Sequence, residues 1–199
     1  MTATNPQSRT IILASTSPYR RELLERLRLD FTTMAPTTDE TIHEGESPAA
    51  LVERLASDKA HSIADQTGDA LVIGSDQVAE VDGQILTKPE LHERARAQLR
   101  SCSGRQVVFH TGLCVLDAAS GSATTAREIF TIRFRPLTDE EIERYLNTEA
   151  PYDCAGSIRS EGYAVTLFQS MQGDDPTALI GLPLIRLADL LRAHGLLLP

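Results

Sequence analysis

Two acidic positions and several cations have the residue types and the spacing that phosphate chemistry requires. Asp76 follows the short apolar run 71–74, and Asp39 and Glu40 lie in a polar loop rich in threonine and acid. Ligands of α/β sheets bind beyond the carboxyl ends of the strands, so an acid that follows a strand is a candidate for that place. A turn aspartate is the alternative interpretation of Asp76. Acids and cations gathered near strand ends would make a metal-assisted phosphate site.

Lys59 is the most unusual of the cations because it falls on an apolar face. In the segment after Pro48 the apolar residues recur with a helical period, and Lys59 lies near the middle of their arc. An unpaired buried ammonium costs on the order of several kcal/mol, so the side chain must either extend to water or meet an anion. The sequence leaves both possibilities open.

A loop of small residues offers a second place for an anion. Residues 14–17 (ASTS) connect a predicted strand to a helix that begins at Pro18, with Ser17 as its N-cap. The free N–H groups and the dipole of a helix N-terminus favour phosphate. Arg20 lies in the first turn of this helix and projects into its apolar stripe. A plain N-cap is the alternative, because S-x-S-P alone is a weak motif and the chain contains no complete P-loop motif.

The elements that must position these residues alternate along the chain. Short apolar runs and apolar alternation predict strands at 10–14, 31–35, 71–74, 77–81, 107–116, 126–134 and 164–168. The helical period predicts helices at 18–28, 48–65, 89–102, 138–147 and 184–194. Thr138 with Glu141 forms a capping box, and Asp82-Gly83 marks a hairpin turn. We therefore predict one α/β unit over residues 1–199, with two lobes around a cleft, and expect residues 1–9 to be flexible.

Length and composition limit the class of protein. A chain of 199 residues buries about 70% of the surface that its unfolded form exposes, and 41% hydrophobic with 24% charged residues is ordinary for a globular protein. No apolar run reaches the roughly 20 residues of a membrane helix, and the N-terminus lacks a signal peptide, so we expect a cytoplasmic protein. The net charge of −9 disfavours nucleic acid polymers and anionic membranes as partners. A small anionic ligand would bind only where cations gather locally.

The cysteines and histidines indicate neither a disulfide framework nor a zinc site. Cys102, Cys114 and Cys154 are odd in number and form no C-x-x-C pair, so we interpret them as buried small residues. The five histidines are dispersed, and no two have the spacing of a helical metal site. An ordinary structural role is expected for each of them.

Several short segments together resemble the Maf family of nucleotide pyrophosphatases. In chain order they read ILASTSPYRRELL, DET, SPAALVERLASDKA, IGSDQV, LTKP, TGL, CAGS, SEG and IGLPL. The resemblance covers nearly the whole chain, and S-x-S-P-x-R with G-[SA]-D-[TQ] and K-P is highly specific as a set. It implies a mixed twisted sheet with flanking helices around a cleft, and a homodimer. It also implies hydrolysis between the α and β phosphates with a divalent cation, Mg²⁺, Mn²⁺ or Co²⁺.

Carried over residue by residue, the resemblance assigns roles to the candidates above. Asp76 matches the family's proton acceptor, and Glu40 matches an acid that supports the water or the metal, so both are candidate metal ligands. The phosphate-binding positions correspond to Ser15, Arg20, Lys59 and Lys88. These roles suit phosphoryl transfer, which depends on positioning and charge neutralisation, with a carboxylate to deprotonate the attacking water.

Three positions divide the family by substrate, and in this chain they are Tyr19, Gln77 and Glu161. The branch that acts on dTTP and UTP carries Arg, Thr and Gln there, whereas the 7-methyl-GTP branch carries an aromatic residue, Gln and Glu. This chain resembles the second branch. Methylation at N7 makes the purine cationic, so an aromatic face attracts it, and a carboxylate accepts hydrogen bonds from guanine N1 and N2. Tyr19 departs from the Trp expected in this branch and is a poorer cation–π partner.

Three other functions are compatible with the sequence. The first is a pyrophosphatase for dTTP, UTP or deaminated purines, and the second is a non-catalytic nucleotide-binding regulator of cell division and septum formation. The third is a structural α/β protein with an empty cleft, which would have to accommodate Lys59 and Arg20 in apolar stripes. The predicted strands 107–116 and 126–134 are candidates for the dimer interface.

Overall fold

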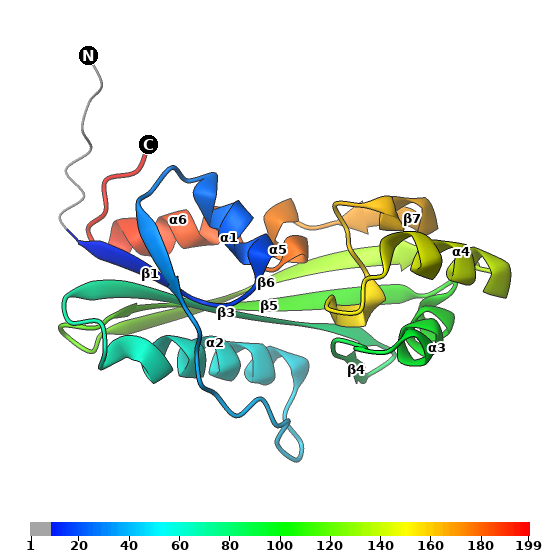
Figure 1. The fold of residues 1–199 in the computed structure, drawn as a ribbon, viewed down its shortest axis with the longest axis horizontal. Helices are drawn as coiled ribbons and strands as arrows, with labels where there is room; N and C mark the ends of the chain where they lie inside the picture. The colour runs from blue at the N-terminus through cyan, green and yellow to red at the C-terminus, as the bar shows by residue number, and fades with distance from the viewer. Residues whose placement is uncertain (1–8) are drawn as a thin grey trace.

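The centre of the fold is a twisted sheet of seven strands (Figure 1). The protein is described here by a computed structural model that covers residues 9–199. The strands are β1 (Thr10–Ala14), β2 (Phe31–Met34), β3 (Ala70–Val81), β4 (Gln84–Leu86), β5 (Gln106–Asp117), β6 (Ala123–Phe134) and β7 (Phe168–Gln172). Their order is β2-β1-β3-β5-β6-β7, and β4 pairs with β3 outside this path. β1 runs parallel to β2 and β3, and the other pairs are antiparallel, which confirms the predicted α/β class and mixed sheet.

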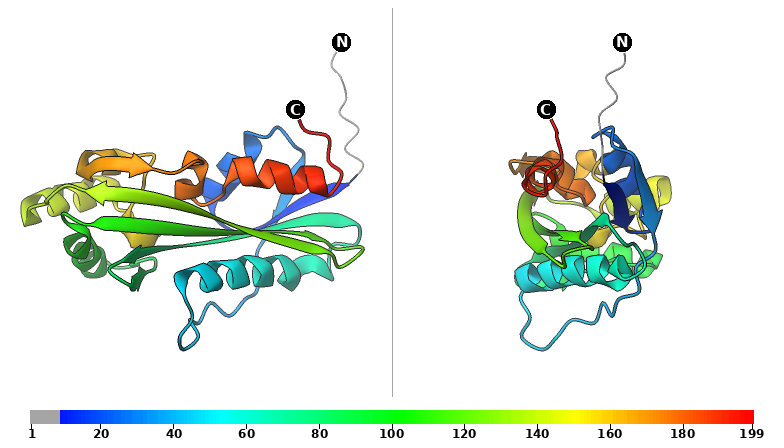
Figure 2. Two further views of the ribbon diagram at one scale, coloured as in Figure 1. Left: turned by 180° about the vertical axis from the view of Figure 1, so that it is seen from behind. Right: turned by 90° about the vertical axis from the view of Figure 1, so that its left-hand side faces the viewer.

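Helices cover both faces of this sheet (Figures 1 and 2). They are α1 (Pro18–Glu25), α2 (Pro48–Ala64), α3 (His92–Cys102), α4 (Asp139–Glu149), α5 (Pro176–Ile180) and α6 (Leu184–Ala193), with the 3₁₀-helices η1 (Ala155–Ser157) and η2 (Tyr163–Leu167). At one end of the molecule α2 lies on one face while α1 and α6 lie on the other, and α3 and α4 cover the opposite end. The long strands β3, β5 and β6 run through both ends, so the two predicted lobes share one sheet.

Helix α2 approaches the sheet so closely that two strand positions have room only for glycine. A Cβ atom on Gly74 would lie 2.0 Å from the backbone oxygen of Ala56, and one on Gly112 would lie 2.1 Å from that of Val52. Glycine therefore lets the helix backbone rest directly on β3 and β5. This contact fixes the distance between the buried face of α2, which includes Lys59, and the strand beneath it.

The predicted starts of α1, α2 and α4 are confirmed, whereas α3 begins at His92 and not at Pro89. The side chains of Ser17 and Ser47 accept the capping hydrogen bonds of α1 and α2, and each helix begins with proline. Thr138 and Glu141 form the complete capping box of α4. α1 ends at Glu25, earlier than predicted, and the chain continues as turns before β2.

The prediction of separate strands at 71–74 and 77–81 is wrong, because residues 70–81 form the single strand β3. Its polar centre does not break the strand, since β5 pairs with it from Leu71 to Glu80. The polar side chains find partners of their own: the Ser75 hydroxyl, for example, lies 2.8 Å from the Gly112 oxygen and 2.9 Å from the Gly181 oxygen. A buried polar side chain that is hydrogen-bonded costs the strand little.

The strand predicted at 164–168 is also wrong. Residues 163–167 form η2, and β7 begins only at Phe168. The buried residues of this segment, Ala164 and Leu167, are three positions apart, which is the spacing of a 3₁₀-helix rather than of a strand. The sequence prediction also missed α5, a helix of five residues that begins with Asp175 as N-cap and Pro176.

We expected residues 1–9 to be flexible, and of these only Arg9 belongs to the residues that the structure describes. The guanidinium of Arg9 donates to both carboxylate oxygens of Asp117, at 2.9 and 2.6 Å, and lies 2.7 Å from Asp69. Within residues 9–199 there is no helix with both the length and the apolar character that crossing a membrane requires.

Candidate active site

A cavity of about 360 Å³ lies where β1 stops and β3 continues. The pairing of β1 with β3 ends at Ala14 and Gly74, and the pairing of β4 with β3 begins at Ala79. Between these points, one edge of β3 has no strand partner in the described part of the chain. The sequence predicted that Asp76 follows the end of a strand, but Asp76 lies inside β3. It does lie beyond the carboxyl end of the neighbouring strand β1.

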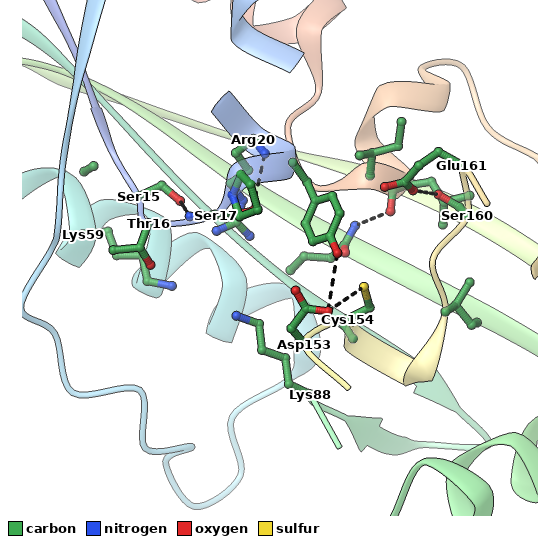
Figure 3. A pocket seen from close by; sticks show the side chains of 18 of the residues that line it. Ser15, Thr16, Ser17, Arg20, Lys59, Lys88, Asp153, Cys154, Ser160 and Glu161 are labelled. Atoms are coloured by element: carbon green, nitrogen blue, oxygen red, sulfur yellow. Dashed lines mark hydrogen bonds between the residues drawn. The ribbon is translucent and has the colours of Figure 1, made fainter. Parts of the chain in front are cut away.

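The free edge of β3 opens the cavity to both faces of the sheet. Successive side chains of a strand point to opposite faces, so Asp76 faces α2 whereas Gln77 faces α5. In Figure 3, Ser15 and Lys59 lie on one side of the hollow and Glu161 on the other. Residues from opposite faces of the sheet thus meet in one cavity.

Lys59 bridges the two predicted acidic residues. Its Nζ atom lies 2.5 Å from Asp76 Oδ1 and 2.7 Å from Glu40 Oε1. Lys59 is only 6% exposed and Asp76 only 8%, so the ammonium meets an anion rather than extending to water. Burial would raise the pKa of Glu40, but the hydrogen bond from Lys59, together with Lys88 and Arg20, holds it below its ordinary value.

Two further cations line the same part of the cavity. The Nε atom of Arg20 donates to the backbone oxygen of Gly181 at 2.8 Å, and its terminal nitrogens have no hydrogen-bond partner among the described residues. Burial lowers the pKa of Arg20, although Asp76 and Glu40 oppose the shift. Lys88 is exposed and also lines the cavity. We call Glu40, Lys59, Asp76, Arg20 and Lys88 the charged end.

The loop before α1 lines the cavity on the side of Lys59 (Figure 3). Ser17 caps the helix, because its hydroxyl oxygen accepts from the Arg20 N–H at 3.4 Å. Ser15 is buried, and its hydroxyl oxygen accepts from the Ser17 N–H at 3.1 Å. The plain N-cap is thus present, and the Ser15 hydroxyl proton is still available to an oxygen of a ligand. Binding of an anion by this loop stays a prediction.

Tyr19, Gln77 and Glu161 gather at the other end of the cavity, which we call the aromatic end. The Gln77 amide nitrogen donates to the backbone oxygens of Ala178 and Leu179 at 2.7 and 3.0 Å. Carbonyl oxygens only accept, so the amide orientation is determined and Oε1 is the atom that can accept from a ligand. Of the site residues that the resemblance assigned, all but Asp76 line this cavity, and Asp76 contacts the lining residue Lys59. Asp39 lies outside the lining.

Asp153 and Cys154 are cavity residues that the sequence prediction missed. The Tyr19 hydroxyl donates to Asp153 Oδ1 at 3.5 Å. Cys102 and Cys114 are buried as expected, but for Cys154 the expectation is wrong, because this residue is only partly buried and lines the cavity. Burial raises the pKa of the Cys154 thiol to about 12, so it is present as the thiol. The signal for this segment was CAGS, whose Gly156 adopts a positive φ of 64°.

Asp76 and Glu40 are the two carboxylates that meet at the charged end. Their oxygens converge on one point, which Lys59 Nζ occupies. In the described part of the chain, no three acidic, histidine or cysteine side chains form a complete metal-binding group. Mg²⁺ commonly binds through one or two carboxylates, with water and substrate phosphates completing its shell. The donor set therefore fits a cation that arrives with a phosphate ligand.

Comparison with known proteins identifies the family. A family model described as "Maf-like protein" matches residues 10–194. A "7-methyl-GTP pyrophosphatase" of Nitrosococcus oceani is 53% identical over 195 residues, which are 98% of this chain and 98% of the relative. A protein of the same name from Polaromonas sp. is 52% identical, and the match covers 99% of this chain and 90% of the relative. One from Pseudomonas syringae pv. tomato is also 52% identical, and the match covers 96% of this chain and 99% of the relative. With its motifs gathered around one cavity and these matches over almost its whole length, the chain belongs to the Maf family.

Proposed function

We propose that this protein hydrolyses 7-methyl-GTP to 7-methyl-GMP and diphosphate. One observation carries the proposal: the charged end and the aromatic end share a single cavity in a chain about half identical, over nearly its full length, to relatives named 7-methyl-GTP pyrophosphatase. The charged end suits a triphosphate, and the aromatic end suits a cationic purine. The cavity volume of about 360 Å³ lies in the range of small-molecule sites.

The charged end would bind the triphosphate by neutralising its charge. Lys59, Lys88 and Arg20 contribute three positive charges, of which Asp76 and Glu40 offset two. The terminal nitrogens of Arg20, which have no partner among the described residues, match two phosphate oxygens. The Ser15 hydroxyl and the N-terminus of α1 add further donors. Phosphoryl transfer requires this kind of preorganised positive environment more than it requires covalent chemistry.

Asp76 would act as the general base. Its carboxylate orients a water molecule, whose oxygen attacks the α-phosphorus while the bond from that phosphorus to the bridging oxygen breaks. The water proton passes to Asp76, and diphosphate leaves with the bridging oxygen. Lys59 holds the carboxylate in place at 2.5 Å, and because it lines the cavity it would also contact a phosphate oxygen of the substrate.

A divalent cation, Mg²⁺, Mn²⁺ or Co²⁺, would be held by Asp76 and Glu40 and would offset the charge of the triphosphate and of the leaving diphosphate. Glu40 suits this role because its side chain is 62% exposed and can turn from Lys59 toward a cation. Removal of divalent metal with a chelator is expected to abolish diphosphate release, and added Mg²⁺ to restore it.

The aromatic end would select the base. The Tyr19 ring offers a face to the cationic purine, and Glu161 accepts hydrogen bonds from guanine N1 and N2. Gln77 adds an acceptor through Oε1, because its amide nitrogen is already bonded to the backbone of α5. These contacts favour a purine whose exposed edge carries donors and a positive charge.

A panel of triphosphates tests the substrate. Purified protein with Mg²⁺ or Mn²⁺ is supplied with 7-methyl-GTP, GTP, dTTP, UTP and a deaminated purine triphosphate, and diphosphate release is measured. We expect the highest kcat/KM for 7-methyl-GTP. Equal or faster turnover of UTP or dTTP would show that the substrate is wrong, and tight nucleotide binding without turnover would favour the regulatory function.

We further propose that the whole chain acts as one domain and as a cytoplasmic homodimer. The family resemblance supports the dimer, and the long strands β5 and β6 are our candidates for its interface. Light scattering on the purified protein tests the assembly, and a monomer across the micromolar range would contradict it.

A further inference from the structure

Arg159 connects two side chains of the aromatic end. Its guanidinium carbon lies 5.6 Å from the centroid of the Tyr19 ring, within the range of a cation–π contact. Its Nε atom lies 3.8 Å from Glu161 Oε1. Tyr19 and Glu161 line the cavity, whereas Arg159 lies outside its lining. The arginine therefore contacts both residues without itself lining the cavity.

A carboxylate that is largely buried holds this arginine in place. Glu149, the last residue of α4, has a side chain only 12% exposed, and its Oε1 accepts from Arg159 Nη1 at 3.1 Å. Its other oxygen accepts from the Tyr163 N–H at 2.7 Å. The segment that carries Glu161 is thus attached to α4 on both sides of Glu161.

The Nε atom of Arg159 has an unused donor. This atom is buried and has no hydrogen-bond partner among the described residues. A carboxylate oxygen of Glu161 lies 3.8 Å from this atom, so a small movement of Glu161 would complete the bond. A buried donor without a partner favours the position of the neighbouring carboxylate that completes this bond.

We propose that Arg159 is a positioning residue for recognition of the base: it holds the Tyr19 ring and the Glu161 carboxylate in the arrangement that receives the cationic purine. This inference rests on the proposed function. The planar guanidinium suits the task because one group stacks on a ring and pairs with two carboxylates, which an ammonium cannot do equally well. Side chains that are already ordered lose less freedom when a ligand binds. Glu149 offsets the positive charge that would otherwise repel the base.

Arg159→Met tests the proposal through the kinetics of 7-methyl-GTP and GTP. We expect the KM for 7-methyl-GTP to rise about tenfold with kcat changed less than about twofold, and the preference for 7-methyl-GTP over GTP to fall. Arg159→Lys, which keeps the charge near Glu149, should give an intermediate KM and carries the same test if the Met variant does not fold. Arg144→Met, at an exposed arginine of α4, is the matched control and should change neither constant.

Introducing Arg159→Met into a second background separates a role in positioning Tyr19 and Glu161 from a role in the stability of the protein. In a Tyr19→Ala, Glu161→Gln background, Arg159→Met should change KM less than about twofold, because the residues through which it acts are gone. An equal rise of KM in both backgrounds would overturn the proposal, and so would tighter binding of 7-methyl-GTP by Arg159→Met. If the unaltered protein turns over 7-methyl-GTP but Arg159→Met behaves like Arg144→Met, only this inference fails. If the unaltered protein does not turn over 7-methyl-GTP, the proposed function fails with it.

Discussion

The buried ion pair of the charged end and the two outer residues of the aromatic end are held by different kinds of structure. At the charged end, Lys59 and Asp76 come from α2 and β3, whose backbones touch at Gly74, and both side chains are almost fully buried. At the aromatic end, Tyr19 lies in the first turn of a short helix, and Glu161 is an exposed residue of the segment between η1 and η2. Chemistry at phosphorus depends on fixed distances, which regular elements provide, whereas loops can change base preference without disturbing the fold.

This contrast predicts that substitutions at the charged end reduce kcat, whereas those at the aromatic end change KM. The largest effect is expected for Asp76→Asn, which removes the general base while keeping the shape of the side chain. We expect kcat to fall about a thousandfold, measured as diphosphate release. Asp174→Asn, at an exposed aspartate, is the control. A loss that appears in KM and not in kcat would contradict both the role of Asp76 and the contrast between the ends.

Lys59→Met should have the next largest effect, on both turnover and stability. Loss of the cation is expected to lower kcat about a hundredfold. It also leaves the buried Asp76 carboxylate without its partner, which costs about 3 kcal/mol in the free energy of unfolding. Denaturant titration and initial rates provide the two measurements.

Lys88→Met separates these two contributions, because Lys88 lines the same cavity but is exposed. It should reduce turnover without reducing stability. If Lys59→Met has the same free energy of unfolding as the unaltered protein, the ion pair of Lys59 with Asp76 does not stabilise the packing of α2 on β3.

Tyr19→Trp should sharpen the contrast with a smaller change. A larger ring is a better cation–π partner, so the KM for 7-methyl-GTP should fall about threefold while kcat is unchanged. Tyr163→Trp, at an exposed tyrosine of η2, is the matched control. A change in kcat, or an equal fall of KM for GTP, would mean that Tyr19 does not read the charge of the base.

The smallest effect is expected at the ion pair that anchors the loop of Glu40 to α2. Arg54 donates to both oxygens of Glu46, at 2.7 and 2.9 Å, and to the Thr41 oxygen at 3.0 Å. The hydrogen bonds from Arg54 lower the pKa of Glu46 from 4.5 to about 2. A lowered pKa in the folded state contributes stability that is complete above pH 4.5 and is lost as the pH falls toward 2.

Glu46→Gln should therefore flatten the loss of stability between these pH values. Thermal unfolding of both proteins, measured at a series of pH values from about 5 down to about 2, gives this loss of stability. Glu44→Gln, at an exposed glutamate, is the control. Identical pH profiles for Glu46→Gln and the unaltered protein would show that the loop is held by other contacts.

Much of the frame could be predicted from local sequence. Strand β1, the caps of α1 and α2 and the capping box of α4 depend on neighbours only a few positions apart, which apolar period and cap chemistry describe well. The failures have the same origin. The polar centre of β3 suggested a break because its partners are distant in sequence, and the short η2 and α5 offer too few residues for a period to be visible.

The candidate site shows the same division between local and distant contacts. The sequence by itself determined that Lys59 falls on an apolar face, and that such a lysine needs an anion or a route to water. Only the tertiary structure decided that the anions are Asp76, 17 residues away, and Glu40. It also decided that Gln77 donates to Ala178, 101 residues away, and that Arg159 packs behind Tyr19. The physical reason is that periodicity and capping act over a few residues, whereas burial and ion pairing join whichever segments the packed sheet brings into contact.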